Sequence, residues 1–140
     1  MTDPIQLKRV YDPVEAADGV RILVDRVWPR GVRKVDLRLD WWARELAPST
    51  ELRKWFGHDP DRWAEFRRRY RDELAQMPET LSTLLDYCRQ GPITLVFGAR
   101  DREHNQVVAL REVLLAELEE DATPNESASP VCYNSSGTRR

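Results

Sequence analysis

Three short apolar runs along this chain have the length and composition of β-strands. They cover approximately residues 5–11, 20–25 and 93–97, and the last two are short and mostly apolar. Runs of this kind are typical of strands that are buried on both faces of a parallel sheet. Because a long stretch separates the second run from the third, we expect these two strands to be parallel and joined by a right-handed crossover.

The stretch between the second and third runs carries the spacing of amphipathic helices. The clearest pattern follows Asp59-Pro60, an N-cap with proline at the first helical position, and repeats apolar residues every three or four positions from Trp63 to Met77. Ser49 has the character of an N-cap and predicts another helix start. Further helices are expected between Asp40 and Pro48, from Pro78 to Gly91, and from about His104 to Glu119.

These elements predict an α/β fold with a small, mostly parallel sheet of three to four strands and helices packed on it. The length of 140 residues suits one domain, which we place over residues 1–120. Residues 121–140 are rich in Ser, Thr, Asn and Pro and have almost nothing to bury, so we expect a disordered C-terminal tail.

Charge is distributed unevenly, although the net charge is only −2. Residues 1–71 hold 16 basic and 12 acidic side chains, whereas residues 72–140 hold 6 and 12. This balance argues against a protein that coats duplex nucleic acid, but a local basic face leaves single-stranded nucleic acid as an alternative partner. No apolar run reaches the ~18 residues that span a bilayer, and the N-terminus lacks a signal-peptide layout, so we expect no membrane association and a cytoplasmic location.

The segment that follows the second apolar run is the strongest candidate for a binding site. Ligands of parallel α/β sheets bind beyond the carboxyl ends of the strands. At this place the sequence has Asp25, Arg26, Trp28 and Arg30. The arginines suit a phosphate or carboxylate, and Trp28 offers a surface for stacking. The alternative is structural, with Asp25 paired to an arginine and Trp28 in the core.

A second candidate segment follows the third run, and a third lies between the predicted helices. Arg100 and Asn105 could reach a ligand beside the first segment, although Asn105 is equally suited to a structural role. Arg53 adds a third arginine to the predicted basic site. His58 has the chemistry of a general acid or base, but a lone histidine next to an N-cap aspartate is more often structural.

Several signatures of cofactor and nucleophile chemistry are absent from the sequence. There is no G-x-x-x-x-G-K-[ST] loop, no G-x-G-x-x-G turn and no G-x-S-x-G elbow. Neither of the two cysteines ends a strand, and two histidines and two cysteines are too few to indicate a closed metal site or a disulfide framework. We therefore expect no cofactor and no metal.

Three motifs resemble the YeaO-like proteins, a branch of a large bacterial domain family of unknown function. They are Lys8-Arg9-Val10-Tyr11-Asp12-Pro13, then Asp18-Gly19-x-Arg21 with Leu23-Val24-Asp25-Arg26-x-Trp28-Pro29-Arg30-Gly31, and Pro48-Ser49-x-Glu51-Leu52-Arg53-Lys54. The resemblance covers about residues 5–118 and implies a Rossmann-like α/β fold without an established activity. The branch typically has Asn-His-Ala after the third strand, where this chain has Asn105-Gln106-Val107.

Three functions are compatible with these residues. The first is an enzyme for a small anionic or nucleotide-like substrate, with Asp25 as acid or base and with Arg26, Arg30 and Arg53 holding the anion. The second is a non-catalytic module that binds a nucleotide or single-stranded nucleic acid by stacking on Trp28. The third is a protein-interaction domain with an aromatic patch. The sequence leaves the ligand, the presence of catalysis and the oligomeric state open.

Overall fold

The structure, a computed structural model, describes residues 4–122 and contains a four-stranded sheet. All neighbouring strands are parallel, and their order is β1-β4-β2-β3. The strands are β1 (Ile5–Arg9), β2 (Val20–Leu23), β3 (Trp41–Trp42) and β4 (Ile93–Phe97). The predicted α/β fold with a small parallel sheet is confirmed.

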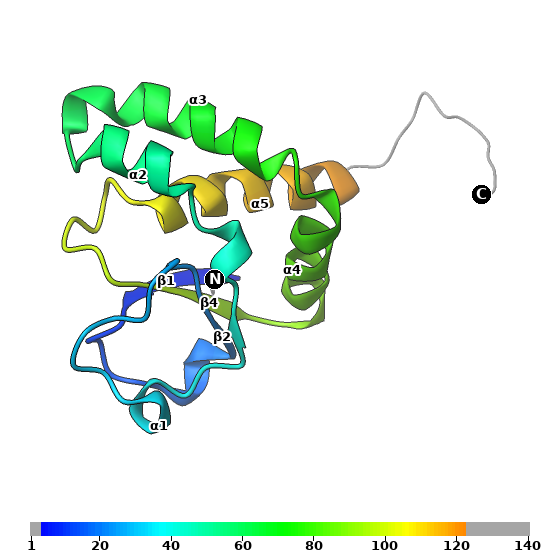
Figure 1. Ribbon diagram of the computed structural model, residues 1–140. Helices are drawn as coiled ribbons and strands as arrows, with labels where there is room; N and C mark the ends of the chain where they lie inside the picture. The colour runs from blue at the N-terminus through cyan, green and yellow to red at the C-terminus, as the bar shows by residue number, and fades with distance from the viewer. Residues whose placement is uncertain (1–3, 123–140) are drawn as a thin grey trace, which may run out of the picture.

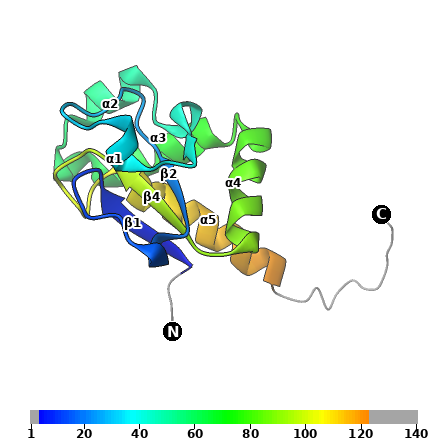
Figure 2. The same cartoon turned by 90° about the horizontal axis from the view of Figure 1, so that it is seen from below.

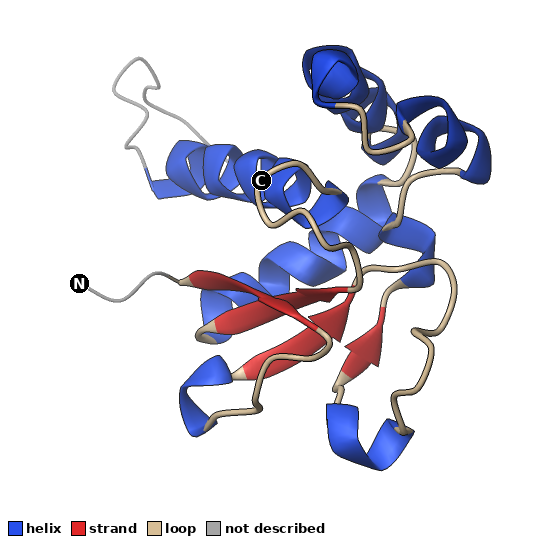
Figure 3. Ribbon diagram, turned by 90° about the vertical axis from the view of Figure 1, so that its left-hand side faces the viewer, coloured by secondary structure: helices blue, strands red, loops and turns tan. Residues whose placement is uncertain are grey.

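Helices flank this sheet unequally. Figures 1 and 3 show α2, α3, α4 and α5 on one side of the sheet and the short α1 on the other. The view from below in Figure 2 places α1 in front of the sheet and α5 behind it. The helices are α1 (Lys34–Leu37), α2 (Thr50–Phe56), α3 (Trp63–Leu74), α4 (Pro78–Gln90) and α5 (Gln106–Ala122), and three short 3-10 helices cover Ala16–Asp18, Arg44–Leu46 and Pro60–Arg62.

Two predicted elements differ from the structure near residue 40. A helix was expected between Asp40 and Pro48, but Trp41–Trp42 forms the edge strand β3, and only the 3-10 turn Arg44–Leu46 follows. A strand of two residues is too short to show an alternating pattern, so the sequence carries no periodic signal for it. The last helix starts at Gln106 rather than His104 and extends to Ala122. The rest of the predicted tail, from residue 123, lies outside the described residues.

The helix-covered face of the sheet carries the main core. Side chains alternate between the two faces of a strand, and Ile5, Ile22, Leu95 and Phe97 all point into this core, where they meet buried residues of α3, α4 and α5 such as Tyr70. These five side chains are at most 1% exposed. The core therefore holds the strand ends, and hence the loops that follow them, in fixed relative positions.

The opposite face of the sheet has a smaller apolar cluster. Leu23 of β2 and Val96 of β4 pack there with Leu37 of α1, and Trp28 and Trp42 cover them from the side. Trp41, by contrast, packs with the main core, where its ring lies 6.0 Å from that of Tyr87. The two adjacent tryptophans thus point to opposite faces of the edge strand.

Candidate functional site

A cavity of about 230 Å³ lies where the loop after β2 meets the loop after β4. It opens at the carboxyl ends of these parallel strands, which is where ligands of such sheets bind. Segments far apart in the sequence line it: Asp25, Arg26 and Val27; Ala47, Pro48, Arg53, Phe56, His58 and Phe66; and Gly98, Ala99, His104, Asn105 and Gln106. The two strand-end loops therefore come together, as the sequence predicts.

Asp25 is the partly buried acid of this cavity. Its Oδ1 accepts a hydrogen bond of 2.6 Å from Gln106 Nε2, and the backbone amide of Gly98 also hydrogen-bonds its carboxylate. Among residues 4–122, no cation forms an ion pair with it. Burial raises the pKa of Asp25 to about 6, because the hydrogen bonds from Gly98 and Gln106 and the more distant charge of Arg53 offset only part of the desolvation.

The residues that hold Asp25 in place were not among the predicted site residues. Gln106 Nε2 donates to Val24 O at 2.8 Å as well as to Asp25, so both of its amide hydrogens are used. A side chain at Gly98 would bring a Cβ atom to 2.8 Å from Asp25 Oδ2. The only sequence signal for Gln106 is its place directly after Asn105, where the resembling family has histidine.

Two arginines line the cavity. They differ in how many hydrogen bonds their guanidinium groups already make within the protein. Arg26 donates to Pro48 O at 3.2 Å and to Ala47 O at 2.8 Å, which fastens the segment before α2 to the strand end. Arg53 is exposed on α2, and no hydrogen bond or ion pair of its side chain is observed within the described part of the chain. Arg53 is therefore the cation most available to a ligand.

Two histidines complete the polar lining. His58 is exposed and adopts a positive φ of 59°, directly after Gly57 at the end of α2. His104 Nδ1 lies 3.0 Å from Asp101 Oδ2, and its ring meets the edge of Trp63 with 5.3 Å between centroids. Asp101 thus orients His104, which the sequence did not indicate as a site residue.

Asn105 lines the cavity but acts as the N-cap of α5. Its Oδ1 accepts from Val107 N at 3.0 Å and from Val108 N at 3.1 Å, and its Nδ2 donates to Asp101 O at 2.7 Å. These amides are consequently not available to an anion.

Three of the predicted ligand-binding residues do not line the cavity found in the described region. Trp28 donates from Nε1 to Val32 O at 2.8 Å and packs edge-on against Trp42, on the other face of the sheet. Arg30 and Arg100 are exposed side chains outside the lining. The structure thus brings together Asp25, Arg26, Arg53 and Asn105 from the predicted set.

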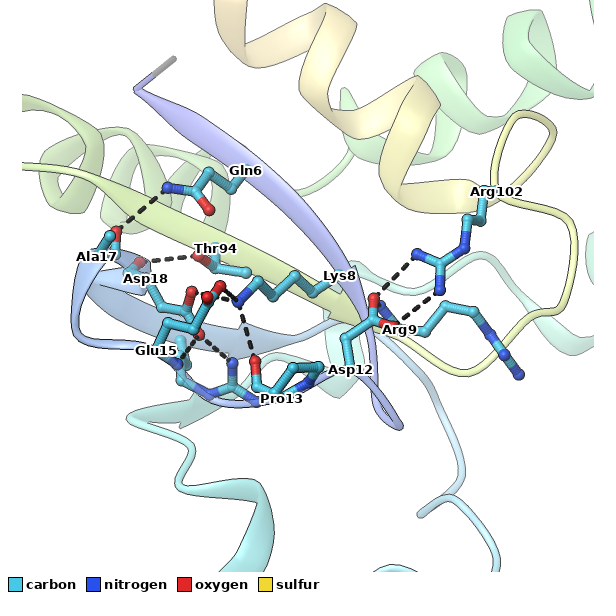
Figure 4. Close-up of polar contacts among 11 residues, drawn as sticks. Gln6, Lys8, Arg9, Asp12, Pro13, Glu15, Ala17, Asp18, Thr94 and Arg102 are labelled. Carbon is cyan, nitrogen blue, oxygen red and sulfur yellow. Dashed lines mark hydrogen bonds and ion pairs between the residues drawn. The ribbon is translucent and has the colours of Figure 1, made fainter. Parts of the chain in front are cut away.

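A second buried aspartate, Asp18, precedes β2 at the opposite end of the strand. Lys8 Nζ lies 2.7 Å from Asp18 Oδ1, and Arg21 Nη1 lies 2.6 Å from Asp18 Oδ2. Figure 4 shows Lys8 reaching across to Asp18 and Glu15, with Thr94 hydrogen-bonded to the backbone of Asp18. Burial opposes ionisation of Asp18, but hydrogen bonds from Lys8, the Glu15 amide and Arg21 lower its pKa.

Residues 4–122 contain neither a membrane-spanning helix nor a cluster of metal ligands. No helix in this range is both long and apolar enough to cross a membrane. The same residues contain no group of three or more His, Cys, Asp or Glu side chains placed to hold a metal ion.

Comparison with known proteins gives a family and uncharacterised relatives. Residues 4–134 match the family described as the inactive DUF488-N3 subclade, DUF488-N3i. The chain is 48% identical over 110 residues to the uncharacterized protein YeaO of Escherichia coli (strain K12), covering 79% of this chain and 96% of YeaO. It is 37% identical over 110 residues to the uncharacterized protein Rv3073c of Mycobacterium tuberculosis, covering 79% of this chain and 92% of the relative. No solved structure matches the chain significantly.

Proposed function

Because this chain belongs to the DUF488-N3i family, whose description is an inactive subclade, we propose that its cavity binds a small anionic molecule without converting it. The observation that carries the proposal is the combination of an available arginine, Arg53, with a partly buried Asp25 that has no cationic partner, both in one cavity. A carboxyl group in a cleft whose pKa is perturbed by burial is a candidate functional residue.

The size of the cavity favours a small ligand. Pockets for drug-sized ligands usually measure about 300–1,000 Å³, and this one measures about 230 Å³. A nucleotide would have to leave much of its structure outside. Stacking of a base on Trp28 has little support, because Trp28 packs against Trp42 on the other face of the sheet.

Catalysis by Asp25 is the second candidate, and one observation favours it. A pKa of about 6 suits a general acid or base near neutral pH. Against it stands the description of the family as inactive. We therefore assign Asp25 to binding and treat turnover as an outcome of the test. A cytoplasmic location remains part of this proposal.

A thermal-shift screen tests the binding proposal. The probes are inorganic phosphate, small carboxylates and nucleoside monophosphates, each added to the wild type and to Arg53→Ala. A probe that binds the native state raises Tm, and the stabilisation grows with the logarithm of its concentration relative to Kd. We expect at least one small anion to stabilise the wild type and to lose most of this effect in Arg53→Ala.

Arg100→Ala is the matched control, because Arg100 is an exposed arginine of the neighbouring loop and lies outside the cavity lining. This variant should respond to the probe as the wild type does. An equal loss in both variants would indicate non-specific charge effects and contradict the site. Product formation on incubation with the bound probe would replace the binding role by catalysis.

A further inference from the structure

The wall of the cavity is not uniformly polar. Phe56 of α2 and Phe66 of α3 stack with 4.4 Å between ring centroids, and both contribute to the lining together with Pro48. Arg53, which lies on the same helix as Phe56, and Asp25 also line this space. A ligand that fills this space meets an apolar surface as well as Arg53, so an inorganic anion would leave that surface unused.

The position of Asp25 adds a second constraint on the ligand. An anion held by Arg53 in the same cavity comes close to the Asp25 carboxylate, whose hydrogen bonds from Gln106 and Gly98 keep it in place. Two carboxylates that share a site cannot both remain ionised without a large penalty, and they relieve it by sharing one proton. A phosphate dianion would meet stronger repulsion than a monoanion.

We propose that the ligand is a small monocarboxylic acid with an apolar body, which contacts Arg53 and Phe56 and shares one proton with Asp25. This inference rests on the proposed anion-binding function and narrows its ligand class. The proton comes from solvent when both carboxyl groups are ionised before binding. No bond of the ligand is broken.

Other titratable groups face the same cavity and must be separated from Asp25. Guanidinium groups do not exchange protons near neutral pH, so the arginines of the lining do not contribute to proton uptake. His58 and His104 can also take up a proton when an anion binds, and Asp101 already pairs with His104. Proton uptake therefore identifies Asp25 only if it survives replacement of the histidines.

Calorimetry with the full chain tests this proposal, with benzoate as the probe and with acetate, benzamide and inorganic phosphate for comparison. Titrations at about pH 7.5, in buffers of different ionisation enthalpy, measure the protons taken up for each benzoate bound. We expect an uptake approaching one proton, and an affinity that falls about tenfold for each pH unit above about 6. Benzoate should bind at least about tenfold more tightly than acetate, because about two buried CH₂ equivalents, at about 0.8 kcal/mol each, suffice for that factor.

Three variants separate the contributions. Asp25→Asn should bind benzoate without proton uptake and without the pH dependence, whereas His58→Gln and His104→Gln should retain both. If Asp25→Asn fails to fold, proton uptake by the wild type and by the two histidine variants still tests whether a group other than the histidines takes up the proton.

The outcomes distinguish this inference from the function on which it rests. Binding of phosphate with no binding of benzoate would leave the anion site standing and overturn the ligand class. Binding of benzoate with zero proton uptake, or tighter binding of benzamide, would also overturn it. Failure of every anion to bind would contradict both proposals.

Discussion

Two aspartates flank the same strand and have opposite electrostatic environments. Asp18, before β2, is 1% exposed and contacts both Lys8 and Arg21, and its pKa is lowered. Asp25, after β2, has no cation at ion-pair distance among the described residues, and burial raises its pKa to about 6. Cations within the fold balance the charge of the first carboxylate, whereas the second has no such cation beside it in residues 4–122.

This difference separates structural from functional parts of the family motifs. Lys8, Asp18 and Arg21 belong to those motifs, yet their side chains form ion pairs that hold the segment before β2 against the sheet. Asp25 belongs to the same motifs and faces a cavity. Motif membership alone therefore does not indicate a binding role, whereas a partly buried charge without a partner marks a candidate for one.

The largest loss in the free energy of unfolding should come from removing Asp18, the aspartate that contacts two cations. Asp18→Ala leaves Lys8 and Arg21 without their shared counterion, and removal of one partner from a buried charge cluster costs about 3–5 kcal/mol. Urea unfolding measures this loss. Glu15→Ala is the control, because the Glu15 side chain that also pairs with Lys8 is 63% exposed, and its loss should cost less than about 1 kcal/mol. Equal costs would show that Asp18 does not anchor the cluster.

Crowding the Asp25 carboxylate should have a smaller effect on stability than removing Asp18. Gly98→Ala places a Cβ atom 2.8 Å from Asp25 Oδ2, so the carboxylate has to shift. We expect a loss of about 1–3 kcal/mol in the free energy of unfolding, together with a change in the pKa of Asp25. Gly91→Ala is the control, since a Cβ atom there meets nothing within 4 Å. Unchanged stability in Gly98→Ala would contradict the close packing around Asp25.

The pH dependence of stability should distinguish the two aspartates. The pKa of Asp25 rises from 3.8 to about 6 on folding, so the folded state binds the proton more tightly. Its contribution is fully present below about pH 4 and is lost as the pH rises through about 6, by about 2–3 kcal/mol. Asp18 acts oppositely, because its lowered pKa gives a contribution that is lost on acidification below its usual pKa.

Denaturation of the wild type and of Asp25→Asn between about pH 4.5 and pH 7.5 measures this difference. The wild type should lose stability relative to the variant as the pH rises across this window. A constant difference between the two proteins would show that Asp25 titrates normally.

The smallest effect concerns the loop that carries part of the cavity wall. Arg102 forms two hydrogen bonds to Asp12, of 2.8 and 2.9 Å, which tie this loop to the turn after β1 and help to lower the pKa of Asp12 to about 2. Arg102→Ala should cost less than about 1 kcal/mol but speed hydrogen exchange of residues 99–104. Arg33→Ala, which removes an exposed pair within α1, should leave that exchange unchanged.

Local sequence patterns predicted the parts of this fold that local physics determines. The apolar runs that became β2 and β4 and the Asp59-Pro60 start before α3 needed no long-range information. The edge strand Trp41–Trp42 does depend on long-range information, because it forms only where β2 offers its free edge. The meeting of the two strand-end loops followed from the parallel topology.

The details of the site depended on contacts between distant residues. Gln106 is 81 positions from Asp25, and nothing in its local sequence shows that it donates to that carboxylate. Trp28 beside two arginines suggested stacking on a ligand, but packing against Trp42 on the far face accounts for it. On sequence grounds Asn105 could bind a ligand or cap a helix. In the structure it caps α5, because its Oδ1 accepts hydrogen bonds from backbone amides of that helix.

A carboxyl ¹³C titration of Asp25, with and without saturating benzoate, tests the central claim most directly. The uncompensated environment predicts a titration midpoint near pH 6 in the free protein and a higher midpoint when benzoate is bound. A midpoint near the ordinary value of 3.8 that benzoate does not move would contradict it.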